Sequence, residues 1–388
     1  MPEIRLGTSG WSYSDWEGVF YRPQESKFQK YCKVFDTVEI DSTFYSYPDS
    51  EMIEGLAKVA PTGFVFAAKI PSLITHEKRL DLNKGVEKDL ERFIEVMDPL
   101  SRSGKIGALL IQLPPKFTYQ NRETLKRFLE ILPKDIRFAV EFRDLSLLRE
   151  DVLDNLSRYD VAYTIVDEPL LPPETHITTD FAYMRWHGKG SNPWYYYHYR
   201  REELEEWKPR IEELEEKVNR IYGYFNNHFK GYAVHNALQV LEILGIITPA
   251  QRRILEKVEK ALSEAKSAAP TLSDILPPEK IPDTVEDMIK LLADERRIAR
   301  GKKIGKELIR VEEAGEEHLI ARVKDYQVII DLEKKTILHD CADWSRVGAK
   351  LHLCKHIIAL ILNLKEEYAE KILRDILLNR AQWTFREI

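Results

Sequence analysis

The chain has 388 residues and a formal net charge of −6, and 44% of its residues are hydrophobic and 31% charged. This length is more than one ordinary hydrophobic core needs, so it predicts two globular domains. The net charge excludes a uniformly basic nucleic-acid binder but allows a local basic patch. Interspersed Glu, Lys and Arg are typical of thermophile proteins, in which networks of ion pairs add stability at high temperature.

The sequence predicts neither a targeting signal nor a disulfide framework. No apolar run is long enough to cross a bilayer, and residues 1–10 already resemble a strand, so we expect no signal peptide and no membrane contact. Two of the three cysteines lie in one short motif, which favours metal binding in a reducing cytoplasm over a disulfide framework. The third, Cys32, is expected to be a small buried apolar residue. We therefore expect a cytoplasmic protein.

Short apolar or β-branched runs recur as far as residue 227. There are eight of them: Ile4–Ser9, Thr37–Asp41, Phe64–Ile70, Ala108–Leu113, Arg137–Arg143, Ala162–Asp167, Ala182–His187 and Ile221–Asn227. Helix-like stretches such as Glu87–Met97, Arg122–Leu132 and Arg201–Val218 lie between them. This alternation predicts a parallel sheet, and eight units in this length favour a (β/α)8 TIM-like barrel. The alternative is an open doubly wound sheet, although no glycine-rich phosphate-binding motif follows the first strand.

Polar residues gather at the C-terminal ends of these runs. They are Thr8, Ser9, Glu39, Asp41, Lys69, Gln112, Glu141, Arg143, Asp167, Arg185, His187, Asn226 and Asn227. Because side chains alternate between the two faces of a strand, residues two apart, such as Glu39 and Asp41, share one face. The C-terminal mouth is where barrel enzymes hold their catalytic groups, so we expect an active site there. The alternative is a layer of structural ion pairs that plugs the barrel.

Eight motifs follow one another in residues 1–245. They are Gly7–Trp11 (GTSGW), Thr37–Tyr45 (TVEIDSTFY), Phe66–Lys69 (FAAK), Thr75 and His76 with Arg79, Ile111–Pro115 (IQLPP), Val140–Asp144 (VEFRD), Tyr183–Gly188 (YMRWHG) and Tyr224–Asn227 (YFNN). In this order they resemble the YecE-like family, the domain of unknown function seventy-two. The resemblance implies a (β/α)8 barrel distantly similar to endonuclease-IV-like barrels, but it implies no particular reaction.

The zinc-binding His cluster of endonuclease-IV barrels has no recognisable counterpart in this sequence. Only His76, His187 and His228 can be placed near the expected mouth. The resemblance therefore implies no trinuclear metal site, and whether the mouth binds a metal stays open.

A linker and a second domain follow the barrel. Residues 268–284 are rich in Pro, Ala and Ser and predict a linker. We place the barrel at residues 1–246, a helix with the Pro-rich linker at 247–283, and a small α+β domain at 284–388. This last domain is expected to contain a helix from Val285 to about Arg300, strands at Glu307–Val311, His318–Val323 and Tyr326–Leu332, and an apolar helix at Ile357–Leu364.

Two close pairs of metal-ligand residues lie in this domain. Cys341 and Asp343 form the first pair, and Cys354 and His356 open the last helix. Four ligands in two short motifs suit a structural zinc site, one ion per chain. The pattern resembles a SWIM-type zinc finger (C-x-C, a gap, then C-x-H), with Asp343 in place of the second Cys. His339 and His352 are possible substitutes, and a metal-free turn with two free thiols is the alternative.

A basic run precedes the zinc motif. It contains Arg296, Arg297, Arg300, Lys302, Lys303 and Lys306. Beside a zinc module these cations are candidates for contacts with DNA phosphates, as the SWIM resemblance also implies for DNA or protein partners. The alternative is a solvated helix end.

Lys69 is the strongest catalytic candidate. It ends an apolar strand, so we expect it at the mouth near Arg143 and Arg185, where burial and neighbouring cations favour a neutral, nucleophilic amine. Such a lysine forms a Schiff base with an aldehyde, for instance the open-chain sugar of an abasic DNA site. The acids and bases expected to assist are Glu39, Asp41, Glu141, Asp167 and His187. The alternatives are a charged Lys69 paired with Glu39 or Asp41, or a phosphate-binding Lys69 beside the two arginines.

Further residues at strand ends and in loops are expected to bind substrate or phosphate. They are Trp11, Tyr45, His76, Arg79, Gln112, Arg143, Arg185, Asn226 and Asn227. Aromatic residues interleaved with cations suit stacking on bases, but sugars also stack on aromatic rings.

Three functions fit these patterns. The first is a DNA-repair lyase or endonuclease that acts at abasic or damaged sites, with the barrel for chemistry and the zinc module for docking. The second is a barrel enzyme acting on a sugar or sugar phosphate, with a partner-binding zinc module. The third is a non-catalytic DNA-binding adaptor.

Overall fold

The computed structural model describes residues 2–190, 194–267, 281–341, 344–348, 352–380 and 383–387. The chain divides into two compact units, Met1–Ala265 and Lys266–Ile388, and each has its own hydrophobic core. Among the described helices, none is both long enough and apolar enough to span a membrane.

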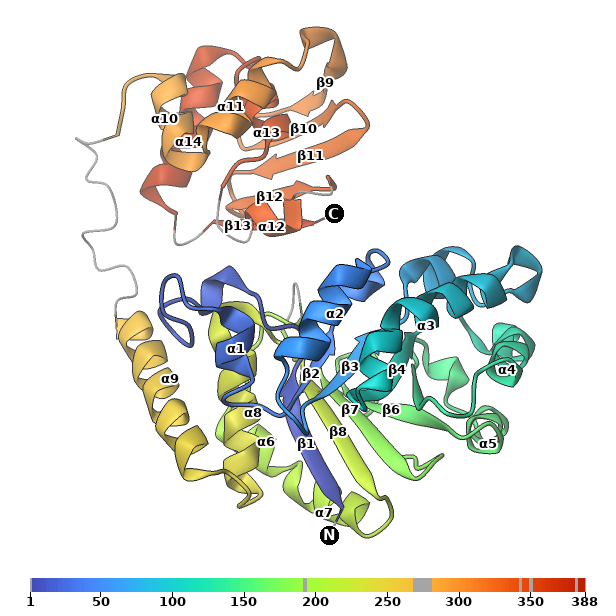
Figure 1. The fold of residues 1–388 in the computed structure, drawn as a ribbon. Coiled ribbons are helices and arrows are strands. Elements are labelled where there is room, and N and C mark those ends of the chain that lie inside the picture. The colour runs from blue at the N-terminus through green and yellow to red at the C-terminus, as the bar shows by residue number, and fades with distance from the viewer. Residues whose placement is uncertain are drawn as a thin grey trace. The chain divides into compact units, whose positions relative to one another are not determined.

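Eight parallel strands form the centre of the first unit (Figure 1). They are β1 (Glu3–Thr8), β2 (Thr37–Ile40), β3 (Val65–Lys69), β4 (Ile106–Gln112), β5 (Phe138–Glu141), β6 (Val161–Asp167), β7 (Phe181–Trp186) and β8 (Arg220–Phe225). Their order is β1-β8-β7-β6-β5-β4-β3-β2, and an isolated parallel bridge between Ser9 and Glu39 joins β1 to β2. The sheet is therefore a nearly closed barrel, which confirms the predicted TIM-like fold and all eight predicted strands.

Helices surround the barrel, with α3, α4 and α5 on one side and α6 and α8 on another (Figure 1). The helices of this unit are α1 (Lys27–Tyr31), α2 (Ser50–Val59), α3 (Val86–Arg102), α4 (Arg122–Glu130), α5 (Glu150–Arg158), α6 (Arg201–Glu205), α7 (Lys208–Glu215), α8 (Tyr232–Ile243) and α9 (Pro249–Ser267). The predicted stretch Arg201–Val218 is two helices, because Pro209 lies in the first turn of α7 and starts a new helix.

The barrel interior is built in layers. One layer sets small residues against aromatic ones: Ala67, Ala108, Ala139 and Ala162 against Phe181, Tyr183, Tyr222 and Tyr224. Because inward-facing side chains recur every second residue, the next layer toward the C-terminal ends begins two residues later. Lys69 follows Ala67 in this way, Glu141 follows Ala139, and Arg185 follows Tyr183. A packed apolar layer therefore forms a floor beneath a layer of charged side chains.

The second unit is a mixed sheet covered by helices. Its strands are β9 (Ile309–Ala314), β10 (His318–Val323), β11 (Tyr326–Asp331), β12 (Thr336–His339) and β13 (Thr384–Glu387), in the order β13-β12-β11-β10-β9. Its helices are α10 (Val285–Leu292), α11 (Glu295–Lys302), α12 (Trp344–Gly348), α13 (Lys355–Ile361) and α14 (Glu366–Leu378). Strands β9 to β12 are antiparallel, whereas β13 pairs with β12 in parallel.

Some boundaries differ from the sequence-based expectation. The helix predicted from Val285 to Arg300 is two helices, because Asp294 caps a new one by accepting a hydrogen bond from the Arg297 backbone N–H. Helix α9 packs on the barrel core through Leu255 and Val258. The predicted linker lies for the most part outside the described residues. Strands β12 and β13 and helix α14 were not predicted.

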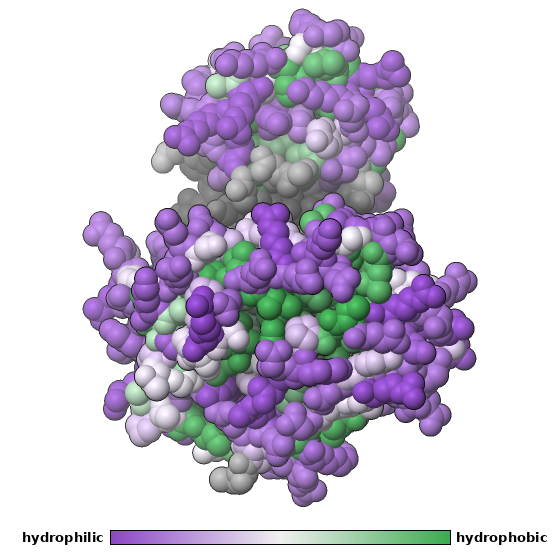
Figure 2. Space-filling model, turned by 45° about the vertical axis from the view of Figure 1, so that its right-hand side comes forward, coloured by the Kyte–Doolittle hydropathy of each residue, from purple (hydrophilic) through white to green (hydrophobic). Residues whose placement is uncertain are grey.

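The visible surface is largely hydrophilic, and hydrophobic residues gather in the middle of the barrel unit's face in Figure 2. Several exposed apolar side chains of the barrel follow the C-terminal ends of strands: Tyr45 after β2, Leu145 after β5, Leu170 after β6 and Tyr196 after β7. The rim of the mouth is therefore partly apolar, although the mouth itself is charged.

Candidate active site and candidate metal centre

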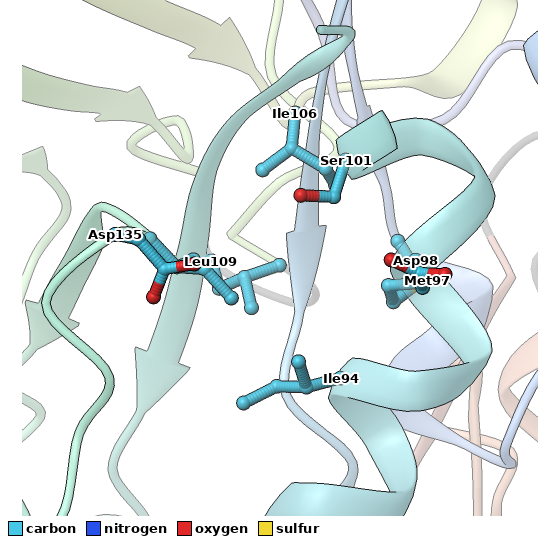
Figure 3. A pocket seen from close by; sticks show the side chains of 8 residues that line it. Ile94, Met97, Asp98, Ser101, Ile106, Leu109 and Asp135 are labelled. Carbon is cyan, nitrogen blue, oxygen red and sulfur yellow. The ribbon is translucent and has the colours of Figure 1, made fainter. Parts of the chain in front are cut away.

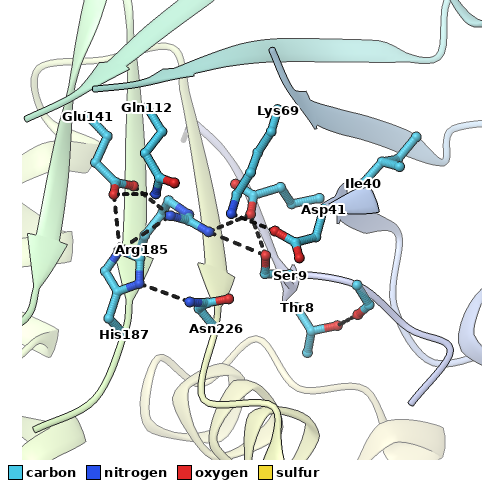
Figure 4. Close-up of polar contacts among 12 residues, drawn as sticks. Thr8, Ser9, Ile40, Asp41, Lys69, Gln112, Glu141, Arg185, His187 and Asn226 are labelled. Carbon is cyan, nitrogen blue, oxygen red and sulfur yellow. Dashed lines mark hydrogen bonds and ion pairs between the residues drawn. The ribbon is translucent and has the colours of Figure 1, made fainter. Parts of the chain in front are cut away.

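A buried network of charges lies at the C-terminal end of the barrel strands (Figure 4). Arg185, at the end of β7, donates to Glu39 over 2.7 Å and to Glu141 over 2.6 Å, and all three side chains are fully buried. Although burial alone would raise it, Arg143 and Arg185 hold the pKa of Glu141 well below its usual range. Tyr183 and Ser9 donate to Glu39, and Gln112 donates to Glu141 over 2.7 Å.

A second arginine, which is more exposed than Arg185, contacts this network. Arg143, 11% exposed, forms ion pairs with Glu141 and with Glu168, and its Nη2 lies 3.2 Å from Nε2 of His187. Burial, followed by Arg143, lowers the pKa of His187 to about 3, so this imidazole is neutral at pH 7. Burial outweighs Arg143 at Glu168 and raises the pKa of that carboxyl to about 7. The site thus holds one firmly ionised carboxylate and one carboxyl that titrates near neutrality.

Lys69 and Asp41 form a further ion pair of the site, in which Asp41 is the more exposed member. Lys69 Nζ lies 2.5 Å from Asp41 Oδ1, and their side chains are 8% and 24% exposed. Burial tends to raise the pKa of Asp41, but Lys69 and Arg185 outweigh it and lower it. Lys69 Nζ also lies 5.4 Å from the centre of the Phe44 ring. In Figure 4 the two side chains point toward each other from neighbouring strands.

Other groups predicted for the site surround this pair. His76 lies within electrostatic range of Arg143 and Lys69, and burial together with these cations lowers its pKa. Tyr45 is 75% exposed on the loop after β2. Asn226 contacts Nδ1 of His187 over 3.0 Å. Of these groups, Tyr45 lies within electrostatic range of Asp41, so an exposed aromatic ring accompanies the more exposed carboxylate of the site.

Three of the predicted residues are engaged elsewhere. Asp167, the last residue of β6, accepts a hydrogen bond from Trp207, and its Oδ1 lies 3.5 Å from Nζ of Lys189. Its carboxylate is therefore paired outside the network around Arg185. Asn227 is buried and donates to the Tyr197 carbonyl. The Trp11 ring packs against Phe28, with ring centres 5.2 Å apart.

Arg79 is exposed, in a left-handed backbone conformation (φ 53°). Glu168, which sequence reasoning missed, contacts the network more directly than its neighbour Asp167. The signal available was its place directly after a strand that ends in an acid.

The cavity of Figure 3 lies away from this chemistry. It is about 100 Å³ and is lined by residues of α3, of β4 and of the segment before β5: Ile94, Met97, Asp98, Ser101, Ile106, Leu109, Asp135 and Ile136. Ile106 begins β4, so this cavity is nearer the N-terminal end of the strands. Barrel enzymes keep their catalytic groups at the opposite end.

Four metal-ligand side chains meet in the second unit. His339 ends β12 and Cys341 follows it, while Cys354 caps α13 and His356 lies in its first turn. All four are buried, and one ligand atom from each lies within 4.8 Å of the others. Two thiolates and two imidazoles are the ligand types that zinc prefers. Hydrogen bonding with Cys354 lowers the pKa of the Cys341 thiol, whereas burial raises the pKa of the Cys354 thiol.

His339 is held as a metal ligand would be. Its Nδ1 donates to the Gln327 backbone carbonyl, which leaves the lone pair on Nε2, and that buried atom has no hydrogen-bond partner among the described residues. The predicted set contained Asp343 instead, which lies outside the described residues. Within the described part of the chain the fourth side chain of the cluster is His339, one of the two substitutes considered.

The cations predicted to contact DNA lie on α11 and just after it. Arg297 is paired with Asp294, and Lys302 with Glu286. The remaining four are exposed and form no ion pair with a described residue: Arg296, Arg300, Lys303 and Lys306. This part of the second unit therefore has cations available for a phosphate.

Comparison with known proteins identifies relatives of the barrel. A model of the family described as "Protein of unknown function DUF72" matches residues 5–260. UPF0759 protein YunF of Bacillus subtilis (strain 168) is 27% identical over 271 residues, which cover 63% of this chain and 95% of that protein.

Two solved structures share the fold. A DUF72 family protein from Thermotoga maritima MSB8 is 32% identical with a TM-score of 0.57, and the match covers 63% of this chain and 99% of that one. A DUF72 family protein from Enterococcus faecalis V583 is 24% identical with a TM-score of 0.55, and the match covers 63% of this chain and 98% of that one. These matches concern the barrel.

Proposed function

Since the chain belongs to the DUF72 family and its barrel gathers acids, a base and an amine at the strand ends, we propose that the barrel is an enzyme acting on the carbonyl group of a sugar. The observation that carries this proposal is the Lys69–Asp41 ion pair beside the buried charge network, in which the Asp41 side chain is 24% exposed. An amine beside a carboxylate can attack a carbonyl and manage the protons of that reaction.

The reaction assigns one role to each member of the pair. A proton passes from Lys69 Nζ to Asp41, and the freed amine forms a bond to the aldehyde carbon while its second proton moves to the carbonyl oxygen. Asp41 then returns its proton to that hydroxyl, which leaves as water. The products are a protonated imine on Lys69 and an ionised Asp41. The short distance between Nζ and Oδ1 suits both transfers.

Among sugars with an aldehyde, we propose the abasic site of DNA as the substrate. From its imine, the ionised Asp41 takes a C2′ proton, the C2′–H electron pair forms a carbon–carbon double bond, and the 3′ phosphate leaves with the electrons of its bond to C3′, which makes the enzyme a lyase. Two features support a nucleic acid. The first is the exposed cations of α11, and the second is the exposed aromatic side chains Tyr45 and Tyr196 on loops after the barrel strands, which suit stacking on bases.

Two other functions compete with this one. The first is an enzyme for a free sugar or sugar phosphate, with a second unit that binds a protein partner. The second is a DNA-binding adaptor without catalysis. A hydrolytic endonuclease would share the substrate but form no imine.

Reductive trapping with borohydride distinguishes these functions. The full chain is incubated with an end-labelled duplex containing an abasic site, and in parallel with a free aldose, before reduction. We expect a protein–DNA adduct that is lost in both Lys69→Ala and Lys69→Arg, because a guanidinium keeps the charge but cannot form the imine. Lys58, 78% exposed on α2, gives the matched control Lys58→Arg, which should trap as the wild type does.

Other outcomes of this experiment contradict the proposal in different ways. Adducts with the aldose alone exclude DNA as the substrate. Cleavage without any adduct, retained in Lys69→Arg, excludes imine chemistry and leaves Lys69 an electrostatic role.

We also propose that the second unit binds one structural zinc ion through His339, Cys341, Cys354 and His356. Four protein ligands leave no open position, which is the arrangement of a structural site. Each pair is separated by one residue and follows a strand meander, as in the SWIM-type resemblance, here with a His in the first place. In this role the zinc would hold β12 against α13 and thereby fix the unit that carries the exposed cations.

A further inference from the structure

A second cluster of side chains that could bind a metal ion lies inside the barrel. Glu141 ends β5, Glu168 follows β6 and His187 follows β7, so three successive strands deliver them to one point. One ligand atom from each lies within 4.8 Å of the others, and the three side chains are at most 1% exposed. Two carboxylates and an imidazole make up a common set of ligands for Mn²⁺ and similar ions.

The guanidinium of Arg143 lies among these three groups. It is ion-paired with Glu141 Oε1 and Glu168 Oε2, and its Nη2 is 3.2 Å from His187 Nε2. It therefore contacts the same three atoms that a metal ion would use.

His187 completes this cluster. Its Nε2 lies 3.2 Å from Nη2 of Arg143, 3.3 Å from Nη1 of Arg185 and 3.4 Å from Oε1 of Glu141. Nδ1 lies 3.0 Å from the side-chain nitrogen of Asn226, and this contact fixes the plane of the ring. Nε2 of His187 is therefore held at the point where the guanidinium of Arg143 meets the carboxylates.

One carboxylate oxygen of this cluster forms no hydrogen bond with Arg143. Glu168 Oε1 is buried and has no hydrogen-bond partner among the described residues. A buried carboxylate without a cation destabilises the folded protein. Arg185 cannot replace Arg143 here, because it already forms ion pairs with both Glu39 and Glu141. Removing the charge of Arg143 would therefore leave Glu141 and Glu168 short of positive charge in a buried place.

We propose that Glu141, Glu168 and His187 form a cation site whose resident cation is the Arg143 guanidinium. The guanidinium is tethered, because Arg143 lies only two residues after Glu141, and the Trp194 ring lies over it, with Cζ 5.7 Å from the ring centre. The site is thus occupied by the chain itself, and divalent metals bind there only when Arg143 is replaced. This inference concerns binding and does not depend on the proposed lyase reaction.

Counting bound Mn²⁺ by electron paramagnetic resonance tests the inference on the full chain. Mn²⁺ prefers oxygen and nitrogen ligands, so it leaves the Cys-containing cluster of the second unit aside. We expect no stoichiometric Mn²⁺ in the wild type or in Arg143→Lys, which keeps a cation in place. We expect about one Mn²⁺ per chain in Arg143→Met, lost again in the double variant with Glu168→Gln.

Arg149, which lies over the Tyr119 ring after the same strand, provides the matched control, and Arg149→Met should bind no Mn²⁺. If Arg143→Met does not fold, Arg143→Gln makes the same test with a neutral hydrogen-bonding head. A wild-type Mn²⁺ site that disappears in Glu168→Gln would overturn the proposal, because the arginine would then not be the resident cation. Folded Arg143→Met and Arg143→Gln proteins that both bind no Mn²⁺ would overturn it equally.

Discussion

The barrel mouth and the second unit each contain a cluster of side chains that could bind a metal ion. The two clusters differ in the group that these side chains contact. In the mouth, Glu141, Glu168 and His187 surround an arginine head group. In the second unit, His339, Cys341, Cys354 and His356 face one another, and Nε2 of His339 has no hydrogen-bond partner among the described residues. The comparison teaches that ligand types and spacing define a site for a cation, whereas the remaining contacts decide whether that cation is a metal or a side chain.

The largest expected effect concerns the zinc ligands. In the full chain, Cys354→Ser or chelation should lower the thermal midpoint of the second unit by roughly 15 °C or more, because zinc-linked stabilisation reaches about 4 kcal/mol when free zinc exceeds Kd a thousandfold. Scanning calorimetry measures both units, and the barrel transition should stay in place. Cys32→Ser in the barrel is the matched control. A second unit whose midpoint is indifferent to chelator would remove the proposed difference between the two clusters.

A smaller effect concerns the pH dependence of the barrel. The pKa of Glu168 is raised to about 7 in the folded state from 4.5. The folded state therefore favours the protonated carboxyl: its contribution to stability is complete below about pH 4.5 and is lost as the pH rises through about 7. Relative to Glu168→Gln, the wild-type barrel should lose up to about 3 kcal/mol between pH 4.5 and 8.

Urea unfolding of the full chain at several pH values measures this loss. The exposed Glu54 supplies a control, since Glu54→Gln should shift the profile little at any pH. If the free energy of unfolding of the wild type and of Glu168→Gln changes with pH in the same way, the prediction is wrong. The ion pair with Arg143 would then offset the effect of burial on the pKa of Glu168.

The smallest expected effect concerns DNA docking. Replacing Arg296, Arg300, Lys303 and Lys306 by Gln should weaken DNA binding and reduce its salt dependence by about 0.9 in log–log slope for each cation that contacts a phosphate. Replacing Arg297 and Lys302 should do less, because each already has a carboxylate partner. Fluorescence anisotropy at several salt concentrations measures both. An unchanged slope in the fourfold variant would place DNA binding elsewhere or nowhere in the second unit.

Much of the barrel could be predicted because strand periodicity and strand ends are local features. Alternation of side chains placed Glu39, Glu141 and Arg185 on inward faces, and the structure has them there. Glu168 could not be placed, because it lies one residue beyond β6, where the alternation of the strand no longer determines the direction of the side chain. That Arg143 points inward onto Glu168 depends on contacts between strands distant in sequence.

The metal cluster shows a different limit. Pairs of ligands separated by one residue occur in two registers, His339 with Cys341 and Cys341 with Asp343, and spacing alone does not choose between them. The pairing of β12 with β11 brings His339 to the Gln327 carbonyl, and this hydrogen bond orients the ring. Sequence could therefore predict a metal site at this place, but the fourth ligand depends on sheet register.

Elemental analysis of the purified full chain tests the central difference most directly. The account predicts one zinc per chain in the wild type, the same amount in Glu168→Gln and Arg143→Lys, and none in Cys354→Ser. Two zinc ions per chain, or a single zinc that survives Cys354→Ser and is lost in Glu168→Gln, would contradict it, because a metal would then occupy the place assigned to the guanidinium of Arg143.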